Sequence, residues 1–227
     1  MKSAGEVRLS GSDGSTGVGP AYTIDVVLVA VCSDVHGRIE RLQSFLAAAI
    51  DAGAQQCWCL GDVVDALGAA SFEDNAACVE LVQASCALKL AGNHEAWALR
   101  SGLLDSATAA VCASWPPGVV SDDGILTVHG SPRDPWMEFV HDEASAAAAL
   151  AAIPGWLGLH GHTHVPRLWA QTDQDPVLKR RRRAGQVFGA AAAERLLACP
   201  GALTGKRPSF LLVDFPARTL RWQRLAA

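Results

Sequence analysis

The strongest constraint on the fold is a pattern in which short apolar runs end in a small or turn residue and then in a polar side chain. Residues Cys57–Asp62 (CWCLGD) are the clearest case, because an apolar run of strand length reaches a glycine and stops at one carboxylate. Four further runs end in the same way. The polar residues are Asp34 and His36 after Val26–Cys32, Asn93 and His94 after Ala87–Gly92, His129 after Ile125–Val128, and His162 and His164 after Trp156–Gly161.

The segments between these runs predict a parallel sheet in the first half of the chain. Residues 39–50 repeat apolar side chains at helical spacing, and Gly53 is a typical helix stop. Further helices are expected at Glu73–Ser85 and His94–Leu104. This order is typical of a parallel, right-handed βαβαβ unit. Because ligands in such sheets gather outside the carboxyl ends of the strands, we expect the polar residues to form one site.

The second half of the chain has a different pattern, which makes the predicted fold a mixed α/β (α+β) domain. We expect strands at 119–128, 156–160 and 165–170, a helix at 142–152, and a closing hairpin at Ser209–Phe215 and Arg218–Arg224. Residues 171–208 are expected to be mostly loop, with one helical piece near Ala190–Leu197. A length of 227 residues fits one domain, which we place at 21–227 after a flexible, glycine-rich segment at 1–20.

Composition narrows the classes of partner. Apolar residues make up 50% of the chain, which excludes general disorder, and a net charge of −4 gives no reason to expect a nucleic acid. No apolar run has the length of a bilayer span, and no signal peptide is visible, so we expect a soluble cytoplasmic protein without a membrane partner. The seven cysteines favour reduced buried thiols over disulfides or a zinc knuckle. The cationic run Lys179–Arg183 favours a solvated loop over a patch for an acidic partner.

The polar residues at the run ends have the chemistry of metal ligands. Imidazole and carboxylate groups without thiolate suit Mn, Fe, Co, Ni or Zn rather than a structural zinc site. The Asp34-x-His36 and His162-x-His164 spacings bring both side chains to one site only if the backbone turns, and the neighbouring glycines permit that turn. Each fragment alone is a weak indication, but all five in this order specifically indicate a metal site.

With these motifs the chain resembles the calcineurin-like metallophosphoesterase superfamily, and within it the small bacterial phosphodiesterase branch with the stretch His129–Pro135 (HGSPRDP). The resemblance runs from about Val27 to Val213. It implies a β-sandwich flanked by helices, with two divalent metal ions at the strand ends and manganese favoured. It further implies that Asp34, His36, Asp62 and His164 hold one ion, that Asp62, Asn93, His129 and His162 hold the other, and that Asp62 bridges them.

The resemblance implies hydrolysis of phosphoesters by a hydroxide that bridges the metals. Two divalent ions bring +4 against two carboxylates and one hydroxide, so the site stays positive toward a phosphate anion. His94 resembles the family's catalytic histidine, which acts as general acid. Asp65 matches the aspartate that orients this histidine, with a cap or turn residue as its alternative. Arg133 is a candidate for substrate phosphate, with a turn paired to Asp134 as its alternative.

Two departures from related phosphatases guide the choice of substrate. Asp65-Ala66-Leu67 stands where protein phosphatases and dinucleoside tetraphosphatases have Asp-Arg-Gly, so a phosphate-gripping arginine is absent, and Cys199–Ala202 stands where relatives have Asn-Pro-Gly-Ser. The first departure argues against those two activities, and the resemblance to the phosphodiesterase branch makes phosphodiesters the expected substrates. A phosphomonoesterase or nucleotide phosphatase is the alternative enzyme, and a metal-bound protein-interaction scaffold is the alternative of another class. His160 is expected to be a core strand histidine, with support of a metal ligand as its alternative, and Trp136 is a candidate cleft wall.

Overall fold

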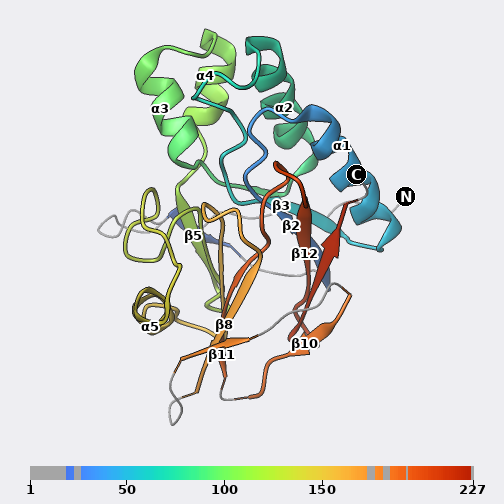
Figure 1. Ribbon diagram of the computed structural model, residues 1–227, viewed down its shortest axis with the longest axis vertical. Coiled ribbons are helices and arrows are strands. Elements are labelled where there is room, and N and C mark those ends of the chain that lie inside the picture. The colour runs from blue at the N-terminus through green and yellow to red at the C-terminus, as the bar shows by residue number, and fades with distance from the viewer. Residues whose placement is uncertain (1–18, 23–26, 173–176, 181–184, 193, 226–227) are drawn as a thin grey trace.

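The computed structural model describes residues 19–22, 27–172, 177–180, 185–192 and 194–225, and these form two stacked sheets with helices on both outer faces (Figure 1). The six-stranded sheet has the order β10 (Val187–Gly189), β13 (Thr219–Arg224), β12 (Ser209–Asp214), β2 (Leu28–Cys32), β3 (Gln56–Cys59), β4 (Leu88–Lys89). The seven-stranded sheet has the order β1 (Gly19–Tyr22), β5 (Gly118–Ser121), β6 (Leu126–Val128), β7 (Leu157–His160), β11 (Arg195–Cys199), β8 (Arg167–Gln171), β9 (Leu178–Arg180). The helices are α1 (Ile39–Asp51), α2 (Phe72–Ser85), α3 (Asn93–Ser101), α4 (Ser106–Ala113) and α5 (Glu143–Ala151).

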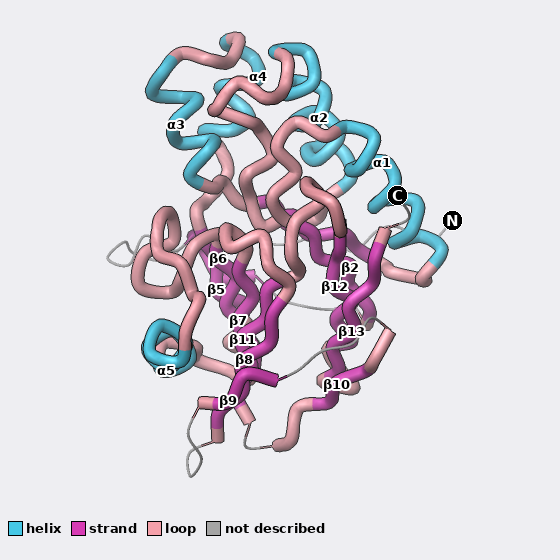
Figure 2. Tube along the Cα trace, viewed as in Figure 1, coloured by secondary structure: helices cyan, strands magenta, loops and turns pink. Residues whose placement is uncertain are grey.

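Strand β2 shows why the apolar runs are continuous. Its side chains alternate between two apolar environments, because successive residues of a strand point to opposite faces. Val29 and Val31 pack between the sheets, whereas Ala30 and Cys32 pack against α1–α4. Helix α5 packs on the outer face of the other sheet (Figure 2). The sandwich flanked by helices is therefore confirmed.

The N-terminal βαβαβ unit is also confirmed. β2 pairs with β3 in parallel, β3 pairs with β4 in parallel, and α1 and α2 are the connections. This pairing brings the carboxyl ends of all three strands to one edge of the sheet, where the polar side chains begin.

Two predictions in the second half were wrong. Residues 119–128 form a hairpin rather than one strand, because the turn after β5 places Gly124 at φ 75° and β6 returns antiparallel. Residues 171–208 were expected to be mostly loop with a helical piece near Ala190–Leu197, but their described part contains β9, β10 and β11, and β11 lies between β7 and β8. Leu196 and Ala198 face the sandwich interior and Leu197 faces α5, so burial on both faces overrides the local helical preference of the alanines.

Some predictions fall partly outside the described residues. Residues 1–18 of the flexible segment and residues 181–183 of the cationic run lie there, whereas Gly19 and Pro20 belong to β1 and Lys179 and Arg180 to β9. In the part of the chain that the structure describes, no helix has both the length and the apolar character needed to cross a membrane.

Candidate metal centre

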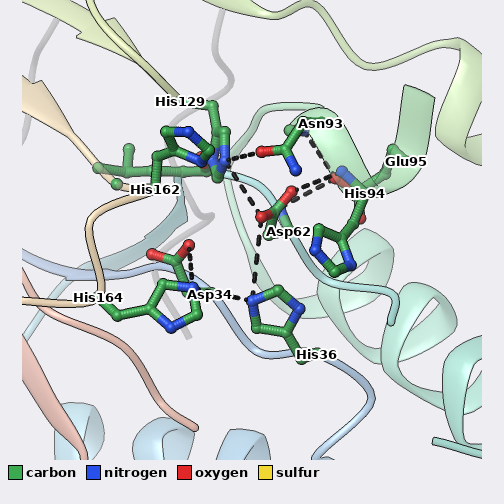
Figure 3. Close-up of polar contacts among 12 residues, drawn as sticks. Asp34, His36, Asp62, Asn93, His94, Glu95, His129, His162 and His164 are labelled. Atoms are coloured by element: carbon green, nitrogen blue, oxygen red, sulfur yellow. Dashed lines mark hydrogen bonds and ion pairs between the residues drawn. The ribbon is translucent and has the colours of Figure 1, made fainter. Parts of the chain in front are cut away.

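The structure brings all seven predicted ligands together where the strands of both sheets end (Figure 3). Asp34 and His36 follow β2, Asp62 follows β3, and Asn93 is the first residue of α3 after β4. From the other sheet, His129 follows β6, while His162 and His164 follow β7. The site therefore lies between the two sheets and depends on their stacking.

The backbone at these strand ends adopts the left-handed conformation. Of the six described non-glycine residues with positive φ, five are at the site, namely Asp34, His36, Asp62, His162 and His164. Such conformations cost free energy and persist only where surrounding structure enforces them. Two neighbouring loops enforce them here, because Asp34 N donates to Gly61 O at 3.0 Å and His36 N donates to Asp62 O at 3.0 Å.

The first donor group consists of Asp34, His36, Asp62 and His164, whose ligand atoms lie within 4.8 Å of one another. His36 Nε2 is 3.1 Å from His164 Nε2, and His164 Nε2 is 3.3 Å from Asp34 Oδ1. The Asp34 carboxylate is wholly buried, and within the described residues its oxygens accept no well-aligned hydrogen bond. Since a buried carboxylate without donors is costly, a cation fits this position. Burial lowers the pKa of His36 to about 4, which keeps its ring neutral and able to bind a metal.

The second donor group consists of Asp62, His129 and His162, again within 4.8 Å, and Asn93 joins it. His129 Nε2 lies 3.1 Å from Asn93 Oδ1 and 3.2 Å from Asp62 Oδ2. His36 Nε2 approaches the same Asp62 Oδ2 at 3.9 Å. One aspartate oxygen is therefore shared by the two groups, which is the arrangement a bridging ligand requires.

Hydrogen bonds orient the histidines of this second group. His129 Nδ1–H donates to Leu60 O at 2.8 Å, which turns Nε2 toward Asp62 and Asn93. Burial opposes the charged ring, but the facing Asp62 carboxylate raises the pKa of His129 to about 10. His162 Nε2–H donates to Met137 O at 3.2 Å and its ring stacks on Phe139, so Nδ1 is the nitrogen left for an ion. The second donor group therefore stabilises positive charge, which a metal ion would supply in place of the His129 proton.

His94 lies next to these groups, and its ring is fixed by the backbone. Its Nδ1 accepts the Ala66 N–H at 3.0 Å, so the neutral ring carries its proton on Nε2. The backbone N–H of His94 donates to Asp62 Oδ1 at 2.9 Å. The ring is buried, and its centroid lies 4.3 Å from that of His36. His94 is therefore held beside the donor groups in a fixed orientation, with Nε2 as its other ring nitrogen.

Asp65 lies close to His94 but bonds elsewhere. Its carboxylate accepts the N–H groups of Leu67, Ala69 and Ala70, which makes it the cap of the 66–70 turn. Its Oδ1 is 3.6 Å from His94 Nδ1, beyond hydrogen-bond range. The orienting role expected of Asp65 stays a prediction, and the direct contact to His94 Nδ1 comes from the Ala66 N–H.

Glu95 is a residue that the sequence analysis did not single out. Its wholly buried carboxylate accepts four backbone N–H groups, those of Asp62, Val63, Val64 and Gly92, at 2.7 to 2.9 Å. It thereby joins the loop of Asp62 to the start of α3. Burial raises the pKa of Glu95 to about 7. The signal available in the sequence was a glutamate three residues after Gly92, the position from which a side chain can accept the N–H of the residue that caps the helix.

Three other predicted residues have clear positions. The Arg133 guanidinium binds Glu138, not Asp134, and its predicted contact with substrate phosphate stays a prediction. His160 is buried in β7, where its Nδ1–H donates to Gly161 O at 3.1 Å and burial lowers its pKa to about 4. Trp136 lines a cleft beside Asn93.

Fold and site together describe a sandwich protein with donors for a pair of divalent cations. A sequence model of the calcineurin-like phosphoesterase family matches residues 27–202. The chain belongs to this family of hydrolases, which confirms the family predicted from its motifs.

The chain is also similar to solved structures and to a curated protein. A metallophosphoesterase from Sphaerobacter thermophilus is 25% identical, with a TM-score of 0.75 over 89% of each chain. The protein PH1004 from Pyrococcus horikoshii OT3 has the same fold, with 13% identity and a TM-score of 0.62 over 88% of each chain. The protein MJ0912 of Methanocaldococcus jannaschii is 30% identical over 107 residues, a match that spans 46% of this chain and 42% of that protein.

Proposed function

We propose that the chain is a dinuclear-metal-dependent phosphoesterase that hydrolyses phosphodiesters. The observation that carries this proposal is the shared Asp62 Oδ2, which faces His36 on one side and His129 on the other. Asp34, His36, Asp62 and His164 would hold one ion, and Asp62, Asn93, His129 and His162 the other. Donors without thiolate suit manganese.

The donor set has the charge that this reaction needs. Two bound divalent ions would supply positive charge for phosphate oxygens and an acidified water as nucleophile. The chain contributes only two carboxylates, Asp34 and Asp62. Asn93 is a neutral ligand, and so are the histidines once an ion has replaced the proton of His129. The site therefore keeps an excess of positive charge for an anionic ester.

His94 is proposed as the general acid. As general acid, His94 would act in its imidazolium form, with Nδ1 facing the Asp65 carboxylate 3.6 Å away. Its Nε2 proton would pass to the leaving oxygen as the phosphorus–oxygen bond breaks, and the ring would become neutral. Ala66 also stands where protein phosphatases and dinucleoside tetraphosphatases carry a phosphate-gripping arginine, which argues against those two activities.

The test is a phosphoester panel with added manganese, run on the wild type and on His94→Ala. For a diester with an alcohol leaving group, we expect the variant to lose about 10²- to 10⁴-fold in rate with its metal content unchanged. Loss should be smaller for bis(p-nitrophenyl) phosphate, because p-nitrophenolate leaves without a proton. His141→Ala, at an exposed histidine, is the matched control.

Equal rates for His94→Ala and wild type on both diesters would remove His94 from the mechanism. Faster turnover of p-nitrophenyl phosphate than of the diesters would instead make the chain a phosphomonoesterase. Metal content measured by elemental analysis accompanies each assay.

A further inference from the structure

A cleft of about 590 Å³ lies beside the candidate metal centre, between the start of α3 and the turn at 134–137. Its lining residues are Asn93, Ala96, Trp97, Arg100, Asp134, Trp136 and Met137. Residues 93, 96, 97 and 100 follow the i, i+3, i+4, i+7 spacing of one helix face, so they share one side of α3. On the opposite side, Asp134 Oδ1 accepts the N–H groups of Trp136 and Met137 and holds the turn. The volume is that of a small-molecule site.

The cleft lies where a leaving group would depart. His94, the proposed acid, precedes Trp97 by three positions in α3, and the two ring centroids are 5.2 Å apart. The cleft adjoins the site at Asn93, so a group attached to the oxygen that His94 protonates can extend past Trp97 into it. Trp136 lines the same cleft from the 134–137 turn. Arg100 follows Trp97 by three residues on the same face of α3 and also lines the cleft.

We propose that this cleft is a leaving-group subsite for a planar heteroaromatic ring, that of a nucleoside. The proposal rests on the phosphodiesterase function above. Indole rings are stacking surfaces for nucleobases, and the Arg100 guanidinium offers donors to acceptor atoms at the edge of such a ring. Hydrolysis then breaks the bond between phosphorus and the nucleoside oxygen. Water supplies the oxygen that joins phosphorus, and His94 supplies the proton that joins the nucleoside.

The direction of cleavage tests the proposal. The methyl ester of adenosine 5′-monophosphate has two alcohols of similar leaving ability, and only one of them carries a ring. With manganese present, we expect adenosine and methyl phosphate as products, identified by ³¹P NMR and chromatography. Adenosine 5′-monophosphate and methanol as the main products would place the ring on the retained side and overturn the proposal.

A second measurement uses the metal-free chain, so it does not depend on catalysis. Adenosine should quench tryptophan fluorescence after chelation of metal. Trp97→Leu and Trp136→Leu should each weaken this binding on the order of tenfold, since one lost stacking surface has roughly that effect. Trp97→Phe should recover most of the affinity. Trp156→Leu is the matched control, because Trp156 is a half-buried tryptophan outside the cleft lining.

The two measurements separate the failure of this proposal from that of the proposed function. Diester turnover without adenosine binding would overturn the subsite and leave the phosphodiesterase intact. If no ester is hydrolysed, the proposed function fails and the leaving-group assignment fails with it, whatever the fluorescence shows. Equal adenosine affinity in Trp97→Leu, Trp136→Leu and wild type would also overturn the subsite.

Discussion

At the scale of single residues, Asp62 shows how much one side chain depends on its neighbours. Its Oδ1 accepts the His94 N–H, and its Oδ2 faces both donor groups. Burial would raise the pKa of Asp62, but the facing His129 holds that pKa well below its usual range. The backbone of Asp62 is held in turn by Glu95. The carboxylate of Glu95, which belongs to neither donor group, therefore sets the position of Asp62, whose Oδ2 both groups share.

Replacing Glu95 by glutamine should destabilise the protein. The amide nitrogen cannot accept the backbone N–H groups that one carboxylate oxygen now accepts, so we expect a loss of roughly 3 kcal/mol in the free energy of unfolding. Chemical denaturation of the metal-free protein measures this. Glu80→Gln, at an exposed position of α2, is the control and should change stability by less than about 0.5 kcal/mol. Equal midpoints for the two variants would contradict the role given to Glu95.

At the scale of elements, the close approach of two strand ends decides which residues can form the site. The loop after β3 and the start of α3 are in direct contact at Gly92. A Cβ at this position would lie 2.7 Å from the Asp62 backbone nitrogen and 2.8 Å from His129 Cε1. Only a glycine permits both elements to be this near.

Gly92→Ala should therefore displace Asp62 and His129. Because displacement by about 1 Å costs on the order of a hundredfold in rate, we expect a loss of that size together with reduced manganese content. Gly189→Ala is the matched control, since a methyl group added at that glycine would meet no atom within 4 Å and its φ is not positive. Wild-type metal content in Gly92→Ala would show that the loops adjust without cost.

At the scale of the whole molecule, the donors come from both sheets of the sandwich. Asp34 and Asp62 follow strands of the six-stranded sheet, whereas His129, His162 and His164 follow strands of the seven-stranded sheet. Metal ions held by both sets would link the two sheets. Their binding free energy then adds to the stability of the sheet packing.

Chelation of metal should lower the thermal midpoint. At a free ion concentration about a thousand times the dissociation constant, ion binding adds about 4 kcal/mol to the free energy of unfolding. Adding manganese back after chelation should therefore restore the thermal midpoint. Calorimetry with and without chelator measures the shift. In His129→Gln the manganese-dependent shift should be smaller, while His141→Ala should keep all of it. An unchanged midpoint on chelation would mean that no tightly bound ion stabilises the fold.

Sequence patterns predicted the first half of the fold well, because its strands are buried on both faces and its helices have a clear periodicity. Strand β11 could not be predicted in this way. Its residues follow an alanine-rich segment with local helical preference, and only pairing with β7 and β8 makes them a strand. The hairpin of β5 and β6, by contrast, has a local signal that the prediction overlooked, because Asp123-Gly124 between two apolar runs is a typical hairpin turn.

The order of residues along the chain was enough to establish the family and the residue types at each strand end, since both depend on local pattern. How these side chains face one another follows only from the folded arrangement. The family resemblance already implied that Asp62 is shared. The structure decided which of its oxygens faces both groups, the four contacts of Glu95 and the cleft lined by Trp97 and Trp136, all of which join segments that are distant in the chain. Such contacts arise from sheet pairing and sandwich packing, which are long-range interactions that no local pattern encodes.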